Sequence, residues 1–165
     1  MAKNTGMLAT LRTNRSLQAG AAVVFLLGAA LAWYLGAPLF LTTTVVEKGA
    51  VATSGTVVAR GELQRVDDVH KGTGPVQIVE LDGKRFLRFA DVAIQNGPDL
   101  HVYLGRGTGG QYDEARDLYL GALKATNGTF TYELPESARL ADYRSVVIWC
   151  RNFRVLFTWA DLNAS

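Results

Sequence analysis

The sequence predicts an all-β domain, an antiparallel β-sandwich, preceded by one transmembrane α-helix. Near the N-terminus of the 165-residue chain, no charged residue occurs between Arg15 and Glu47. After Gly61, short apolar runs alternate with clusters of Gly, Asn and Asp, which is typical of a sandwich built from short strands. The part after Gly61 is long enough to bury the core of one modest domain.

The apolar stretch from Gly20 to Leu41 is the predicted membrane span. About 20 apolar residues, rising about 1.5 Å each, cross a hydrocarbon layer of about 30 Å. A helix of a soluble core would present a polar face, which this stretch lacks. We therefore expect a short cytoplasmic N-terminus over residues 1–18 and a transmembrane helix over residues 19–41.

The charges around this stretch predict its orientation. Lys3, Arg12 and Arg15 precede it, and all 15 acidic residues follow it. By the positive-inside rule, the N-terminus lies in the cytoplasm, and the rest of the chain lies in the cell envelope, outside the cytoplasm. A signal peptide cleaved at Ala30-Leu31-Ala32 is the alternative, but the apolar run continues well past that site.

The charge balance argues against nucleic acid as a partner. Three of the 17 basic residues precede the apolar stretch, so the remainder nearly balances the 15 acids that follow. No basic stripe is left that could neutralise phosphates. The single cysteine excludes an internal disulfide.

Residues 42–60 are rich in Thr, Ser and Gly, and we expect them to form a stalk with one short strand at its end. The domain itself is expected over residues 61–163. Its first hairpin has the turn Asp82-Gly83, a pair that supports the positive φ angles of a type I′ turn. The expected strands cover residues 75–81, 84–92, 99–104, 128–135, 145–150 and 153–160, with a loop and a short strand over residues 111–125.

Strict alternation assigns several polar side chains to one face of their strand. His101 lies opposite the apolar face of its strand and is expected to face solvent. Cys150 lies on the apolar face of a later strand, and Trp149 shares the other face with Arg151.

A glycine pattern in the middle of the domain needs a separate interpretation. Gly105, Gly107 and Gly110 match the dinucleotide-binding pattern G-x-G-x-x-G, and Glu133 lies where an acid that binds ribose would be. That pattern requires a helix directly after the glycines and further βαβ units, and the sequence predicts neither. We interpret the segment as a glycine-rich loop.

Common catalytic and metal-binding motifs are absent, including G-x-S-x-G, H-E-x-x-H, C-x-x-C and C-x-x-C-H. The candidate strong ligands are Cys150, His70 and His101. They match the ligand count of a blue-copper centre, but no His or Met follows Cys150. A haem held by one thiolate or imidazole is a chemical alternative.

The same residues have structural interpretations. Cysteine is among the most buried residue types and often packs as a small apolar side chain. His70, in the sequence DDVHKGTG, is most simply a turn residue.

Four blocks resemble the successive motifs of the DM-thirteen domain, also called the electron-transfer DM domain, over roughly residues 61–162. They are HKGTGPVQIVE, RFLRFADVAIQNGPDLHVYLG, LYLGALKATNGTFTYELP and DYRSVVIWCRNFRVLFTWADL. The segments NGPDLHVYL and SVVIWCRNFRVLF carry the strongest likeness, and the second contains Trp149.

The resemblance assigns motif positions to this chain. The Gly-Pro-Asp motif maps to Gly97, Pro98 and Asp99, and the near-constant cysteine of the family maps to Cys150. An early histidine that is followed by glycine resembles His70.

The resemblance implies a small β-sandwich with a redox role through its cysteine, either as a free thiol or as a ligand to a prosthetic group such as haem. The leading hypothesis is a membrane-anchored electron-transfer domain that meets an envelope redox partner or a surface ligand. We do not expect an enzyme with its own turnover, because no second redox group is visible. The alternative is a non-redox binding or adhesion module of the envelope in which Cys150 is structural.

Overall fold

The computed structural model describes residues 15–40, 42–47 and 54–165. The chain divides into two compact units, Met1–Pro38 and Leu39–Ser165. The first unit is described from Arg15 onward, where helix α2 (Arg15–Phe40) begins.

Helix α2 covers most of residues 19–41, so a helix forms in the expected stretch, but its expected role as a membrane span is not supported. In the three described ranges, however, no helix is both long enough and apolar enough to cross a membrane.

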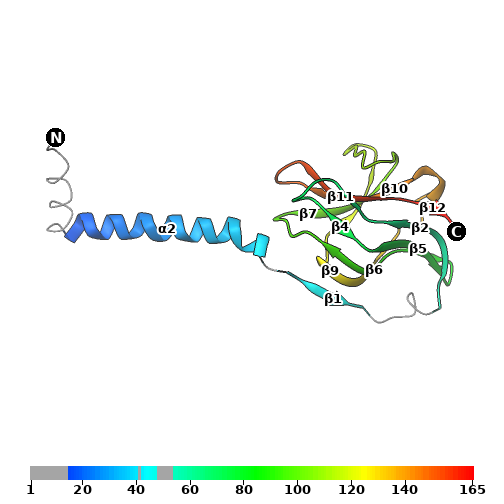
Figure 1. Cartoon of the computed structure of the whole chain (residues 1–165), viewed down its shortest axis with the longest axis horizontal. Helices are drawn as coiled ribbons and strands as arrows, with labels where there is room; N and C mark the ends of the chain where they lie inside the picture. Colours follow the sequence, from blue (N-terminus) through cyan, green and yellow to red (C-terminus); the bar gives the residue numbers. More distant parts are fainter. Residues whose placement is uncertain (1–14, 41, 48–53) are drawn as a thin grey trace. The chain divides into compact units, whose positions relative to one another are not determined.

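Two β-sheets are stacked in the second unit (Figure 1). One layer contains β10 (Ser145–Cys150) and β11 (Val155–Asp161), and the other contains β5 (Pro75–Leu81), β6 (Lys84–Ile94) and β9 (Asn127–Glu133). Sheet A has the order β1-β9-β6-β5-β2-β12, and β4 pairs with β6. Its strands are β1 (Thr44–Val46), β2 (Thr56–Glu62), β4 (Gly72–Thr73), β5 (Pro75–Leu81), β6 (Lys84–Ile94), β9 (Asn127–Glu133) and β12 (Asn163–Ala164).

Sheet B has the order β3-β11-β10-β7-β8. Its strands are β3 (Gln64–Arg65), β7 (Leu100–Gly105), β8 (Leu118–Ala122), β10 (Ser145–Cys150) and β11 (Val155–Asp161). A short 3-10 helix, η1 (Leu140–Asp142), precedes β10. The predicted sandwich is confirmed, and its described strand pairs are antiparallel except that β1 runs parallel to β9.

The predicted hairpin between β5 and β6 is confirmed. Asp82 and Gly83 have φ angles of 53° and 75°, as a type I′ turn requires at both central positions. This turn aligns the two strands so that Val76 and Ile78, on β5, are fully buried.

The folded unit begins earlier than expected. The short strand expected at the end of residues 42–60 is confirmed as most of β2, which pairs with β5, whereas β1, which pairs with β9, lies in residues expected to be stalk. Gly128 on β9 makes the pairing with β1 possible, because a Cβ there would overlap the carbonyl oxygen of Val45. A strand of three residues at a sheet edge shows too little periodicity to be distinguished from a linker.

The core lies between the sheets and is lined by side chains of both. On sheet A, the rings of Phe89 and Phe130 stack with centroids 4.8 Å apart. On sheet B, the inner face of β10 contributes Val146, Ile148 and Cys150, all fully buried. The predicted apolar face of this strand is therefore confirmed.

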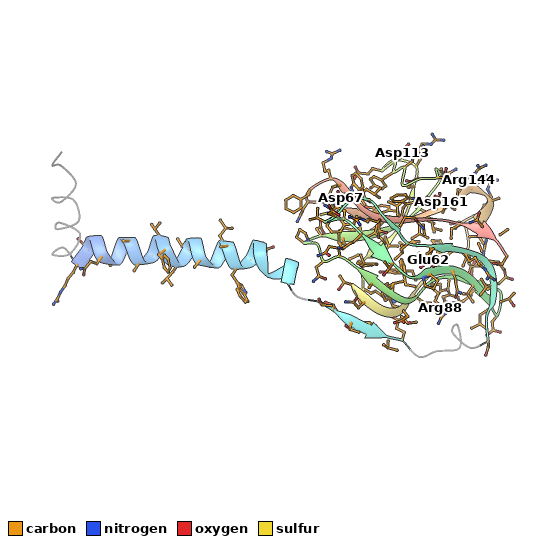
Figure 2. All side chains as sticks on the ribbon, in the orientation of Figure 1. Glu62, Asp67, Arg88, Asp113, Arg144 and Asp161 are labelled. Carbon is orange, nitrogen blue, oxygen red and sulfur yellow. The ribbon has the colours of Figure 1, made fainter. Side chains whose placement is uncertain are left out.

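Two connections of sheet B differ in detail from the prediction. The turn between β10 and β11 spans residues 151–154, longer than the predicted pair Arg151-Asn152, and Arg154 adopts a φ of 52°. Residues 106–117, between β7 and β8, form bends and turns without a helix, so the glycine pattern there is a loop as expected. Asp113 marks this loop in Figure 2.

Candidate functional site

Cys150 ends β10 and pairs with Leu100 on β7 and with Val155 on β11. Its side chain belongs to the core cluster and has 0% exposure. In this conformation its sulfur is therefore not reachable from the rim of the sandwich beside the following turn. Reactive cysteines normally lie in electropositive and partly exposed surroundings, which this position lacks.

His70 lies in a turn, as expected, and Asp67 holds it. The backbone N–H of His70 donates to Oδ1 of Asp67 at 2.6 Å, and its Nδ1 lies 2.7 Å from Oδ2. The hydrogen bond from the imidazole lowers the pKa of the Asp67 carboxyl, with further help from backbone N–H groups. The His70 ring packs edge-on against Phe157, with the ring centroids 4.8 Å apart, so the imidazole contacts both Asp67 and Phe157.

The Gly-Pro-Asp motif connects β6 to β7. A Cβ at Gly97 would lie 2.6 Å from the ring of Phe157 and 2.8 Å from Leu100, so only glycine fits this packing. Asp99 accepts a hydrogen bond at its carbonyl from the N–H of Arg151, at 3.0 Å. The motif therefore fastens the start of β7 to the turn after Cys150.

A cluster of four aromatic rings covers the outer face of sheet B. Its members, called the ring cluster below, are Tyr103, Tyr112, Tyr119 and Trp149. Tyr112 stacks on Trp149 with centroids 4.4 Å apart, and Tyr103 lies 4.9 Å from Tyr112 and 5.2 Å from Tyr119. The rings therefore form a continuous series of contacts from β10 through the 106–117 loop to β7 and β8.

Arg151 lies against two rings of this cluster. Its Nε donates to the hydroxyl of Tyr103 at 2.7 Å, and its guanidinium carbon lies 4.2 Å from the centroid of the Tyr119 ring. The hydrogen bond to Tyr103 raises the pKa of Arg151. Its position on the face opposite Cys150 confirms the alternation that the sequence predicted.

His101 contradicts the expectation that it faces solvent, because its exposure is only 8%. Its Nε2 lies 2.6 Å from Oδ1 of Asp99, and its Nδ1 lies 3.0 Å from the hydroxyl of Tyr119. Alternation correctly placed it on the outer face. Tyr119, on the neighbouring strand β8, contacts this face and helps to shield the imidazole.

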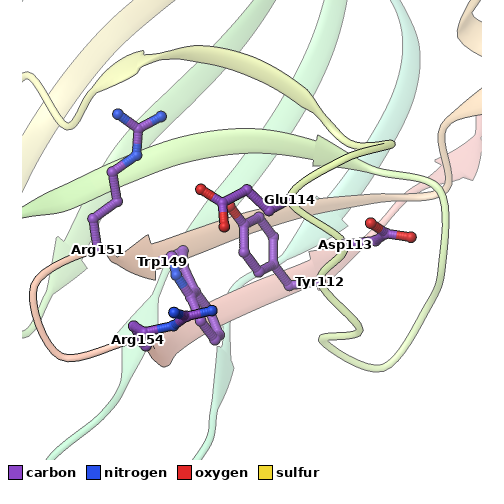
Figure 3. Close-up of a pocket in the computed structure, with 6 residues that line it drawn as sticks. All are labelled: Tyr112, Asp113, Glu114, Trp149, Arg151 and Arg154. Carbon is purple, nitrogen blue, oxygen red and sulfur yellow. The ribbon is translucent and has the colours of Figure 1, made fainter.

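A pocket of about 590 Å³ lies next to Trp149. Two arginines, Arg151 and Arg154, line it from the β10–β11 turn, and Tyr112 and Glu114 line it from the 106–117 loop, together with Asp113 (Figure 3). The lining combines aromatic surface with both signs of charge.

The structure does not bring the candidate ligands together as a cofactor site. Cys150 is buried among apolar side chains, and both ring nitrogens of His101 already lie within hydrogen-bond distance of Asp99 and Tyr119. Within the described part of the chain, no group of three or more His, Cys, Asp or Glu side chains could hold a metal ion. A haem ligated by Cys150 does not fit this conformation, because a fully buried sulfur leaves no approach for the ring.

Sequence reasoning missed the ring cluster, although part of its signal was visible. His101 and Tyr103 share one face of a strand, and Trp149 and Arg151 share one face at the end of another strand. Had the pairing of these two strands been known, their outer faces would have predicted an aromatic and charged patch. The stacking of Tyr112 on this patch is a tertiary contact that no spacing in the sequence indicates.

The fold and these sites define a two-sheet β-sandwich domain with a buried thiol and an aromatic cluster on one outer face. Residues 62–162, more than half of the chain, match the family Electron transfer DM13, and the chain belongs to that family. The resemblance in the sequence is thereby confirmed, and the family description supports a redox role.

No curated protein matches the chain. A solved structure of a mutant superoxide dismutase 5 from Candida albicans is similar, with a TM-score of 0.43 and 12% identity, over 66% of this chain and 92% of that chain.

Proposed function

We propose that this protein is a non-catalytic electron-transfer domain and that the ring cluster carries its single electrons. The observation that supports this assignment most is the unbroken series of ring contacts from Trp149 to Tyr119, with centroids 4.4 to 5.2 Å apart. Indole and phenol rings lose one electron more readily than other side chains except thiols. The family's description as electron transfer supports the same role.

This proposal moves the redox group away from Cys150, where the sequence hypothesis placed it. A thiol with 0% exposure cannot meet a partner or a prosthetic group unless the domain opens. Trp149 precedes it on the same strand but points to the outer face, where a redox partner of the cell envelope would have access through the pocket. The segment that contains both residues would therefore act in electron transfer through Trp149 rather than through Cys150.

One-electron oxidation of the full chain tests this assignment. A photogenerated one-electron oxidant, followed by electron paramagnetic resonance, should produce tryptophanyl and tyrosyl radicals in the wild type. Trp149→Phe should lower the tryptophanyl signal strongly, and Cys150→Ala, the matched control on the same strand, should leave the signals unchanged. A radical yield that is lost in Cys150→Ala and retained in Trp149→Phe would return the redox role to the thiol.

The second candidate function is a non-redox binding or adhesion module, and the burial of Cys150 favours it. In this case Cys150 only packs, and the pocket beside Trp149 holds a surface ligand. Titration of the full chain with haem should then produce no Soret band, and a thiol reagent should react with Cys150 only in denaturant. Absence of ring radicals in the oxidation experiment, together with these two results, would favour this function over electron transfer.

Attachment to a membrane is a separate part of the proposal and is supported by the sequence alone. The stretch from Ser16 to Val46 has no charge and follows three basic residues, which favours an anchor with the sandwich outside the cytoplasm. Extraction of cell membranes with alkaline carbonate tests the anchor, and protease digestion of intact spheroplasts tests the side. Release of the full chain into the carbonate supernatant would exclude an integral anchor.

A further inference from the structure

We propose that Tyr119 is a proton-coupled redox site, in which His101 takes the phenolic proton when the ring loses an electron and Asp99 holds the histidine in position. This inference rests on the electron-transfer function proposed above and specifies where the electron originates. It is carried by the geometry of three polar groups that end the ring cluster.

The direction of the hydrogen bonds follows from their chemistry. The carboxylate of Asp99 only accepts hydrogen bonds, so the Nε2 of His101, 2.6 Å away, carries the proton and donates it. In the neutral imidazole the other nitrogen, Nδ1, is then an acceptor. The hydroxyl of Tyr119 lies 3.0 Å from this Nδ1 and donates to it. A base is therefore already in contact with the phenolic proton.

Burial differs along this series in a way that suits the proposed reaction. The side chain of His101 is only 10% exposed, whereas that of Asp99 is 31% exposed. Tyr119 has 43% exposure, which leaves its ring open to an oxidant or to a partner protein. The proton therefore passes to a shielded imidazole, and the electron leaves from an exposed ring.

The cation above the ring links loss of the proton to loss of the electron. The guanidinium of Arg151 lies 4.2 Å from the centroid of Tyr119 and would repel a positive charge on that ring. Removal of the electron alone would create such a charge, whereas removal of the electron and the proton leaves a neutral phenoxyl. The site therefore favours oxidation in which both particles leave together.

The balanced step uses one electron and one proton. The O–H bond of Tyr119 breaks, its proton forms a new N–H bond at Nδ1 of His101, and one electron passes to a one-electron oxidant, such as a high-potential metal complex at the surface. The products are a neutral phenoxyl, an imidazolium that the Asp99 carboxylate stabilises, and the oxidant reduced by one electron. Reduction of the phenoxyl by a donor returns the proton to oxygen.

The pH dependence follows from the groups that surround the pair. Asp99 contacts His101, Tyr103 and Arg151 contact Tyr119, and Tyr112 packs on Tyr103. Tyr132, on β9, interacts electrostatically with Tyr119. A proton on Nδ1 of His101 would remove the acceptor. Oxidation of Tyr119 through this hydrogen bond should therefore become slower in acid.

The test uses the full chain and flash-generated ruthenium(III) tris-bipyridine as the oxidant, with phenoxyl formation followed by transient absorption across pH. Tyr119→Phe should abolish the fastest phenoxyl phase. His101→Gln should slow that phase by roughly a hundredfold, the usual contribution of a positioned base, and should remove its pH dependence. Asp99→Asn should retain the phase but slow it, because the imidazolium loses the carboxylate that stabilises it.

Controls separate this inference from a purely structural role. Tyr143→Phe is the matched control, because Tyr143 also lies below an arginine, Arg106 at 5.3 Å, but is outside the ring cluster. Circular dichroism should show each variant folded. Unchanged kinetics and pH profile in both Tyr119→Phe and His101→Gln, with ring radicals still formed, would overturn the inference and leave the proposed function intact. Absence of any ring radical in the wild type would overturn the proposed function itself.

Discussion

Two neighbouring residues on β10 show how the alternation of a strand separates packing from function. Cys150 points into the core and is fully buried, whereas Trp149 points to the outer face and stacks on Tyr112. A shift of one residue in register would exchange the two environments. The pairing of β10 with both β7 and β11 fixes that register.

The burial of Cys150 predicts the order of stability of its variants. Cys150→Ser places a hydroxyl in an apolar environment and should cost about 1–3 kcal/mol in the free energy of unfolding. Cys150→Ala, the control, removes the sulfur without adding a polar atom and should cost about 1 kcal/mol. Urea denaturation measures both, and a serine variant as stable as the alanine variant would contradict the packing role.

At the scale of elements, β1 is held to the edge of sheet A by a carboxylate as well as by its strand pairing. Oε2 of Glu47 accepts hydrogen bonds from the N–H and the hydroxyl of Thr131, each at 2.9 Å, and Lys124 donates to Oε1 at 2.9 Å. Partial burial raises the pKa of Glu47, but the hydrogen bonds from Lys124 and Thr131 outweigh it, so the pKa is lowered below 4.5.

This lowered pKa predicts an acid-sensitive edge. Stability from Glu47 is fully present above about pH 4.5 and is lost as the pH falls through the lower pKa of the folded state. The protection factor of the Thr131 amide, which is the intrinsic exchange rate divided by the measured rate at the same pH, should therefore decrease below pH 4.5. Glu47→Gln should exchange faster already at neutral pH and show less change on acidification, whereas an equal acid response in both proteins would exclude Glu47 as the cause.

The 106–117 loop is the second element whose position depends on one side chain. Tyr112 lies between Tyr103 and Trp149, and its burial, together with the neighbouring Tyr103, raises its pKa well above 10.0. The folded loop therefore retains the phenolic proton at pH values where the unfolded chain loses it.

This raised pKa predicts a loss of stability in alkali. The contribution of Tyr112 is complete below about pH 10 and declines as the pH rises above it, because the unfolded chain then releases the proton and the folded chain does not. Urea midpoints measured between pH 9 and 11 should fall less steeply in Tyr112→Phe. Part of the fall in the urea midpoint with pH should persist in Tyr112→Phe, because burial also raises the pKa of Tyr132. A fall identical to that of the wild type would contradict the assignment to Tyr112.

At the scale of the whole molecule, the chain consists of two units, and the sandwich holds its core within the second. Its two sheets supply nearly all of the buried side chains, and the Gly-Pro-Asp motif connects them to the turn beside the ring cluster. The candidate site therefore depends on the sandwich alone.

Independent folding of the sandwich follows from this division. A chain that lacks residues 1–38 should unfold in one cooperative urea transition, with the same midpoint as the sandwich in the full chain. Retention of the ring radicals in the same truncated chain would show that the site is complete within it. A lower midpoint would show that the first unit stabilises the sandwich.

Local sequence signals were sufficient for the sandwich because its hairpins and faces are local features. The Asp-Gly turn, the alternation in β7 and β10 and the apolar run of helix α2 each depend on a few consecutive residues. They also placed Cys150 on the apolar face. Short edge strands such as β1 were missed because three residues carry no measurable period.

The tertiary structure decided which of the chemically active residues meet. Sequence alone could not show that Tyr112 would fold back onto Trp149, because 37 positions, including strands β8 and β9, separate them along the chain. Nor could it show that Asp99, His101 and Tyr119 would form one hydrogen-bonded series, because Tyr119 reaches His101 only through the pairing of β7 with β8. Contacts between strands are set by packing of the whole core, which buried Cys150 and Tyr103 and left Tyr119 exposed.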